Sequence, residues 1–140
     1  MTTPKPRKLF VNLPVRDLER SVAFFTKLGF TFNAQFTDEH ATCMVVSDEA
    51  FVMLLAEARF RDFTRQPIAD ATRVTEALFS YSCDSREEVD HMVTIAVAAG
   101  GRHAMDKQDY GFMYGWSFYD PDGHHWEVMW MDPSHLRPQP

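Results

Sequence analysis

The chain has 140 residues, of which 45% are hydrophobic and 14% aromatic, so it is expected to fold as one domain with a real core. Its formal net charge is −6 and it has no basic run, which argues against nucleic acid and anionic membranes as main partners. No apolar stretch is long enough to span a bilayer, and no secretory signal is visible at the N-terminus, so we expect a cytoplasmic protein.

The first half of the chain predicts a strand, a helix and three further strands. Residues 9–15 alternate as in a strand, and Pro14 falls near its end, where a missing N–H group costs least. Asp17 is a suitable N-cap for a helix whose apolar positions recur at helical spacing until Gly29. The three short strands are expected at residues 30–36, 41–47 and 51–56.

The segment 57–75 is charged and irregular, and Pro67 lies inside it. We expect one short helix at about residues 58–63. The length of the segment suggests a crossover between two halves, which we favour, or a loop over a binding site.

The second half repeats the pattern of the first. Residues 77–83 alternate as a strand, and Ser85 and Glu88 have the spacing of a capping box at the start of a helix. That helix is expected to end at Gly100-Gly101. A short strand, a loop and a long hairpin should follow at residues 102–105, 106–109 and 111–132.

Two consecutive strand–helix–three-strand units predict an internal duplication within a single α+β domain, residues 1–140. The units cover about residues 8–56 and 76–132. Each helix should cover one face of its own sheet. The opposite faces should curve around a shared cavity, and they carry Phe10, Asn12, Leu78, Ser80 and Glu127.

The hairpin turns at Asp120-Pro121-Asp122-Gly123, where Pro and Gly suit turn dihedrals and Asp can bond its own backbone. We expect His124 to be an exposed turn residue. Beyond the turn, Glu127 falls on a largely apolar strand face with His125 as its only polar neighbour. A buried carboxylate is costly unless it is paired, protonated or bound to a metal, so Glu127 is the leading candidate for a functional residue.

The two cysteines, Cys43 and Cys83, both fall in predicted strands. Buried, reduced thiols are the simplest interpretation. A disulfide or a metal-binding pair is the alternative.

Two stretches, VNLPVRDLERSVAFFTKLGF near the start and DPDGHHWEVMWMD near the end, carry a family resemblance. Together with the repeated layout over residues 8–132, they resemble the vicinal oxygen chelate superfamily. That superfamily includes glyoxalase I, fosfomycin-resistance enzymes, extradiol dioxygenases and bleomycin-resistance proteins. The resemblance implies two βαβββ modules that form a U-shaped, partly closed sheet around a cavity, often within a homodimer.

The resemblance also implies a divalent metal, held by three or four ligands from the first and last strands of each module. The first ligand position, seven residues before Asp17, is Phe10, and its counterpart, six residues before Asp84, is Leu78. The last strand of the first module has no carboxylate at its expected position, which is Met53 or a neighbour. Glu127, four residues after the Gly of DPDG, is the one ligand that is preserved.

Phenylalanine and leucine have no donor atoms, and one carboxylate cannot usefully hold a divalent metal. His125 could add a second ligand, which still falls short of three. We therefore predict no metal site and no cofactor.

Glu127 is the candidate catalytic residue, as a general base, or else an acceptor for a polar ligand. The alternative is a remnant carboxylate that is satisfied by a backbone amide, Asn12 or His125. Tyr114 could stack on a planar ligand, or lie at a dimer seam or under a loop. The candidate ligand-binding residues are Phe10, Asn12, Met53, Leu78, Ser80, Tyr114, His125, Glu127 and Met129.

The resemblance and the lost ligands favour a homodimer that binds a small apolar or aromatic molecule in a metal-free cavity, as the bleomycin-resistance branch does. The alternative is a glyoxalase-like lyase, or another enzyme, that uses Glu127 as its base. Such a base would lack the Lewis acid that stabilises an enediolate. A regulatory module without a ligand is a third possibility.

Overall fold

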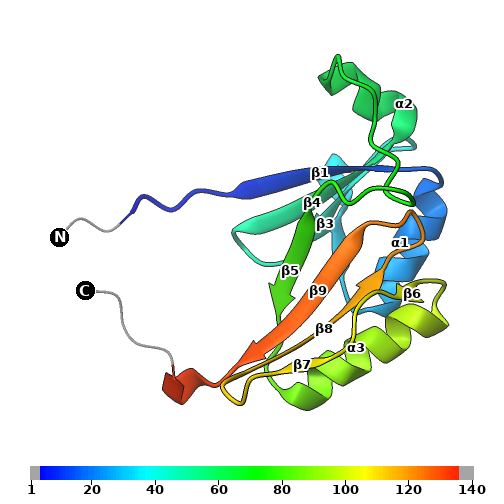
Figure 1. The fold of residues 1–140 in the computed structure, drawn as a ribbon. Helices are drawn as coiled ribbons and strands as arrows, with labels where there is room; N and C mark the ends of the chain where they lie inside the picture. Colours follow the sequence, from blue (N-terminus) through cyan, green and yellow to red (C-terminus); the bar gives the residue numbers. More distant parts are fainter. Residues whose placement is uncertain (1–3, 136–140) are drawn as a thin grey trace. The chain divides into compact units, whose positions relative to one another are not determined.

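Two sheets, each with one long helix, make up residues 4–135, the part of the chain that this computed structural model describes (Figure 1). The chain divides into two units, residues 1–69 and 70–140. Each unit begins with a strand, continues with a helix and ends with antiparallel strands. The predicted α+β class, with two βαβββ-like units, is therefore confirmed.

The first unit holds a four-stranded sheet in the order β1-β4-β3-β2. Strands β1 and β4 are parallel, and the other pairs are antiparallel. Its elements are β1 (Leu9–Val15), α1 (Leu18–Lys27), β2 (Thr31–Asn33), the 3₁₀ turn η1 (Ala34–Phe36), β3 (Ala41–Val45) and β4 (Ala50–Ala56). The helix α2 (Glu57–Phe60) and the 3₁₀ turn η2 (Arg61–Phe63) follow, where one short helix was expected.

Helix α1 begins and ends where its sequence predicts. The Asp17 carboxylate accepts a hydrogen bond from the Arg20 amide at 3.1 Å, and Gly29, with φ of +97°, follows the helix end. The helix buries Phe24 and Phe25 and contacts β4. This face of the unit forms its core, with Leu13, Val15, Phe24, Phe25, Val52 and Leu54 all buried.

The second unit holds a sheet in the order β5-β9-β8-β6, with the short β7 also paired to β8. Strands β5 and β9 are parallel, and the remaining pairs are antiparallel. Its elements are β5 (Leu78–Ser82), α3 (Arg86–Ala98), β6 (Arg102–His103), β7 (Gln108–Asp109), β8 (Met113–Tyr119), β9 (His125–Met131) and the 3₁₀ turn η3 (Pro133–His135).

Helix α3 packs against β8 and β9 and covers one face of this sheet (Figure 1). The Ser85 hydroxyl accepts from the Glu88 amide at 3.0 Å, as a capping box requires. The Glu88 carboxylate, however, accepts from the amide of Asp84 at 2.7 Å, one residue before the N-cap. Val89, Val93 and Ala96 form the buried face of the helix.

Two local predictions from the sequence are wrong. The strand expected at residues 30–36 stops at Asn33, because the Asn33 side chain accepts from the Gln35 amide at 3.0 Å and turns the chain into η1. The loop expected at residues 106–109 contains β7, whose Gln108 and Asp109 pair with β8. Neither residue belongs to an apolar alternation that could have revealed the strand.

The prediction that His124 is an exposed turn residue is also wrong. Its ring is only 2% exposed, and Nδ1 lies 2.6 Å from Glu76 Oε1. Residues of the preceding segment lie against the turn: a Cβ atom on Gly123 would come within 2.7 Å of the Ala71 carbonyl oxygen. Segment 71–76 therefore covers the hairpin turn. Only contacts between residues that lie far apart in the chain could produce this arrangement.

The Asp120 carboxylate organises the hairpin turn between β8 and β9. One oxygen accepts from the amides of Asp122 and His124 at 2.9 and 3.0 Å, and the other accepts from Trp126 Nε1 at 3.0 Å. Asp120 is 4% exposed, and this burial raises the pKa of its carboxyl above the ordinary value. The carboxylate thus satisfies three donors at a site closed to water.

No helix within residues 4–135 combines the length and the apolar character needed to cross a bilayer.

We predict that Asp120→Ala lowers the free energy of unfolding by about 3 kcal/mol, since it leaves buried N–H donors without an acceptor. Urea denaturation measures this loss. The matched control is Asp132→Ala, which removes a carboxylate that accepts from Ser134 in an exposed turn. It should cost far less than Asp120→Ala, and equal losses in the two variants would contradict the prediction.

Both cysteines are free and buried, and they should resist thiol reagents in the native protein. Burial, assisted by the nearby Glu88 carboxylate, raises the pKa of the Cys83 thiol to about 12, and burial also raises the pKa of the Cys43 thiol. Since the thiolate is the reactive form, we expect almost no reaction with Ellman's reagent at mildly alkaline pH. Two thiols should react once guanidinium unfolds the chain; a rapid native reaction would refute this expectation.

Candidate functional site

The candidate site lies on the face of the second sheet that α3 leaves uncovered. Along β9, Trp126 and Val128 are buried on the helix side, at 2% and 0% exposure. The alternation of a strand places His125, Glu127 and Met129 on the opposite face, where each is partly exposed. The prediction that Glu127 and His125 share a face is thereby confirmed.

The register of three strands places Glu127 at the centre of a polar row. Ser80 of β5 pairs with Glu127 on one side, and Ser117 of β8 pairs with it on the other. The row nearer the hairpin turn contains Leu78, His125 and Tyr119, and the row beyond contains Ser82, Met129 and Gly115. Glu127 therefore has two hydroxyl neighbours: Ser80, which the sequence predicted on this face, and Ser117, which it did not.

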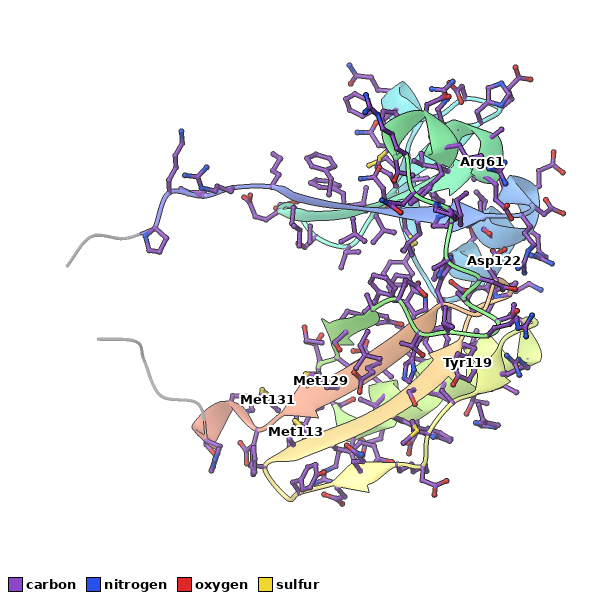
Figure 2. All side chains as sticks on the ribbon, turned by 45° about the horizontal axis from the view of Figure 1, so that its top comes forward. Arg61, Met113, Tyr119, Asp122, Met129 and Met131 are labelled. Atoms are coloured by element: carbon purple, nitrogen blue, oxygen red, sulfur yellow. The ribbon has the colours of Figure 1, made fainter. Side chains whose placement is uncertain are left out.

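A pocket of about 220 Å³ opens on this face. Figure 2 labels Met113, Met129 and Met131 at one end of the β8–β9 hairpin, with Tyr119 and Asp122 towards its turn. The lining combines the sheet face with the segment that joins β6 and β7. The lining residues are Leu78, Met105, Asp106, Gln108, Met113, Gly115, Trp116, Ser117, His125, Glu127, Val128 and Met129.

Within residues 4–135, the Glu127 carboxylate receives one hydrogen bond, from the Ser80 hydroxyl to Oε1 at 3.3 Å. The structure thus identifies Ser80, and neither His125 nor a backbone amide, as its donor. The Ser117 hydroxyl oxygen accepts from the Met105 amide at 3.0 Å, which ties the segment after β6 to the sheet. His125 instead packs edge-to-face against Tyr119, with ring centroids 5.3 Å apart.

Three of the sequence-predicted site residues belong to the first unit. Asn12 pairs with Met53 and Phe10 pairs with Phe51 across the parallel strands β1 and β4, so all four lie on one face of that sheet. The rings of Phe10 and Phe51 stack at 5.0 Å, and Phe10 is 51% exposed. The cavity that these residues were expected to share with Glu127 stays a prediction.

The structure does not bring Tyr114 to the pocket. Tyr114 lies on the side of β8 that faces α3, and it is 8% exposed. Its hydroxyl donates to Asp90 of α3 at 2.6 Å, and the Arg86 guanidinium lies 5.1 Å from its ring centroid. Tyr114 therefore ties the helix to the sheet.

Among the lining residues, the sequence did not single out Met105, Asp106, Gln108, Gly115, Ser117 and Val128. One of them, Gly115, could have been recognised from the sequence. Gly115 interrupts the apolar run of β8, and a glycine inside a strand often marks the close approach of a ligand or another backbone. The other residues gave no signal because their position depends on strand pairing.

The residues around Glu127 do not fit the divalent metal that the superfamily resemblance implies. Its nearest neighbours in the sheet are the hydroxyls of Ser80 and Ser117, and Leu78 has no donor atom. Over the whole described range, no three His, Cys, Asp or Glu side chains come close enough together to hold a metal ion. The lining contains two carboxylates, Glu127 and Asp106, and the imidazole of His125, and these three side chains do not come together around one point.

Comparisons with known proteins agree with this architecture. A family model described as bleomycin resistance protein-like N-terminal matches residues 7–47. A hypothetical protein from S. aureus has a similar structure, with 28% identity, a TM-score of 0.75, and coverage of 90% of this chain and 94% of that one. No curated protein sequence matches the chain.

Two further solved structures show the same fold. A glyoxalase/bleomycin resistance protein/dioxygenase family enzyme from Burkholderia phytofirmans PsJN is 18% identical, with a TM-score of 0.72 and coverage of 87% of this chain and 96% of that one. A lactoylglutathione lyase from Agrobacterium tumefaciens is 16% identical, with a TM-score of 0.66 and coverage of 96% and 100%.

The chain therefore has the fold of the glyoxalase/bleomycin resistance/dioxygenase structures, and its residues 7–47 match a bleomycin resistance protein-like model. In this sense it is a glyoxalase/bleomycin-resistance-like protein.

Proposed function

We propose that the chain binds a small apolar or aromatic molecule, without a metal, in the pocket beside Glu127. The composition of the lining supports this function. Leu78, Met105, Met113 and Met129 supply apolar surface, while Glu127 is one of five polar or charged residues in the lining. Ligand pockets typically combine such an apolar lining with few, well-placed polar groups.

The size of the pocket limits the ligand. Its volume of about 220 Å³ lies below the roughly 300–1,000 Å³ that is typical of pockets for drug-sized molecules. We therefore expect a ligand of one or two rings, or a short aliphatic chain. The flexible thioethers of the methionines can adapt to several such shapes.

Gly115 is the lining residue that most directly tests this function. Its backbone does not require glycine: its φ is not positive, and an added Cβ would meet only the Val128 carbonyl oxygen, at an ordinary 3.5 Å. Glycine inside a strand costs about 0.5–1 kcal/mol relative to alanine. The missing side chain does leave space in the pocket, which supports a role in ligand binding.

We predict that Gly115→Ala raises the free energy of unfolding by about 0.5 kcal/mol or more, whereas Gly115→Val fills the pocket and weakens binding at least about tenfold. The probe is the tightest binder from a thermal-shift screen of small aromatic and aliphatic molecules. Urea denaturation and tryptophan fluorescence titration measure the two effects.

Met131→Leu is the matched control, because Met131 shares this sheet face but does not line the pocket. It should bind the probe as the wild type does. The proposal fails if no molecule in the screen stabilises the wild type, or if Gly115→Val binds the probe unchanged.

We predict that the chain does not catalyse the glyoxalase I reaction. Glu127 could remove a proton next to a carbonyl, but Leu78 and the hydroxyls of Ser80 and Ser117 cannot hold a metal that would stabilise the enediolate. With methylglyoxal, glutathione and added Ni²⁺ or Zn²⁺, thioester formation followed by absorbance should match the rate in buffer. An active glyoxalase I serves as the positive control, and robust turnover by this chain would overturn the prediction.

A further inference from the structure

We propose that the ligand of this pocket carries a cationic N–H head group, as in an alkyl- or arylammonium ion, which donates to Glu127. The inference rests on the proposed function and names the class of ligand. It follows from three features of the second unit: the open acceptor capacity of Glu127, the charges in the lining, and the position of Glu127 beside apolar surface.

The Glu127 carboxylate has unused acceptor capacity. Its two oxygens can accept about four hydrogen bonds, yet within the described residues it receives one, from the neutral Ser80 hydroxyl at 3.3 Å. No donor from residues 4–135 reaches the second oxygen, Oε2. Because a carboxylate beside apolar side chains is stabilised by further donors, a ligand that brings N–H groups satisfies Glu127 where a hydrocarbon does not.

The fixed charges of the lining are negative. Glu127 and Asp106 both line the pocket, and within residues 4–135 no lysine or arginine does. The nearest basic residue in the sequence, Lys107, has its ammonium 4.6 Å from the Trp116 ring centroid and 3.4 Å from the Asp90 carboxylate. Its charge is thus already paired, so the pocket attracts cations and repels anions.

The arrangement also sets the orientation of the ligand. Glu127 lies in the polar row, and the next rows towards the open end of the hairpin contain Met129 with Gly115 and then Met131 with Met113. A head group on Glu127 therefore places an apolar body over Gly115 and between Met113 and Met129, which both line the pocket. Ion pairing in this partly buried setting should be stronger than on an open surface.

Three probes that share a 2-phenylethyl group test the inference: 2-phenylethylamine, 2-phenylethanol and 3-phenylpropionate, which are cationic, neutral and anionic at neutral pH. In titrations followed by tryptophan fluorescence and calorimetry, we expect the amine to bind the wild type at least about tenfold tighter than the alcohol, about 1.4 kcal/mol. The carboxylate should not bind detectably.

Glu127→Gln should remove most of the difference in affinity between the amine and the alcohol, and it should leave the affinity for the alcohol unchanged. Glu87→Gln is the matched control, since it removes the same charge from an exposed position on α3 outside the pocket. Asp106→Asn is a second test should Glu127→Gln not fold, and it should reduce the amine's advantage in the same direction.

The outcomes separate the two proposals. If the wild type binds the amine and the alcohol equally, or if Glu127→Gln folds and keeps the full preference, the cationic head group is wrong and a binding pocket remains. If none of the probes binds at millimolar concentration and the wider screen also finds no ligand, the proposed function itself is wrong.

Discussion

The buried carboxylate of Asp120 is the constraint on which the site depends. By accepting from Asp122, His124 and Trp126 it defines the turn, and the turn determines how β8 pairs with β9. Side chains of a strand alternate between its faces, so a shift of one residue would move Glu127 from the pocket to the helix side. The hydrogen bonds of one acid in the turn thus determine where the second acid, Glu127, lies.

The pocket retains two features that do not favour stability. Glu127 is a carboxylate with a single weak donor beside apolar side chains, and Gly115 leaves a strand without a side chain where alanine would fit. Proteins commonly keep such locally unfavourable residues at functional sites. Their proximity, on paired strands and within one pocket, is a stronger indication of binding than either residue alone.

The internal duplication clarifies how this chain differs from the metal-binding proteins that its sequence resembles. Asn12 and Ser80 occupy equivalent positions before the N-caps Asp17 and Ser85, and they pair with Met53 and Glu127 respectively. The register thus shows that Met53 is the counterpart of Glu127 in the first unit, as the sequence spacing suggested. The fold has kept its repeated framework, while apolar side chains occupy three of the four positions where metal-ligating side chains were expected.

The sequence by itself determined the features that depend on local pattern: the two repeated units, the helix caps at Asp17 and Ser85, the hairpin turn, and the solitary Glu127. Tertiary structure decided the rest. Segment 71–76 buries His124, the chain after β6 forms a wall of the pocket, and strand register sets Ser80 and Ser117 beside Glu127. Tertiary structure also turns the Tyr114 side chain towards α3. The physical reason is that periodicity and capping act within a few residues, whereas burial and pairing join residues that lie far apart in the chain.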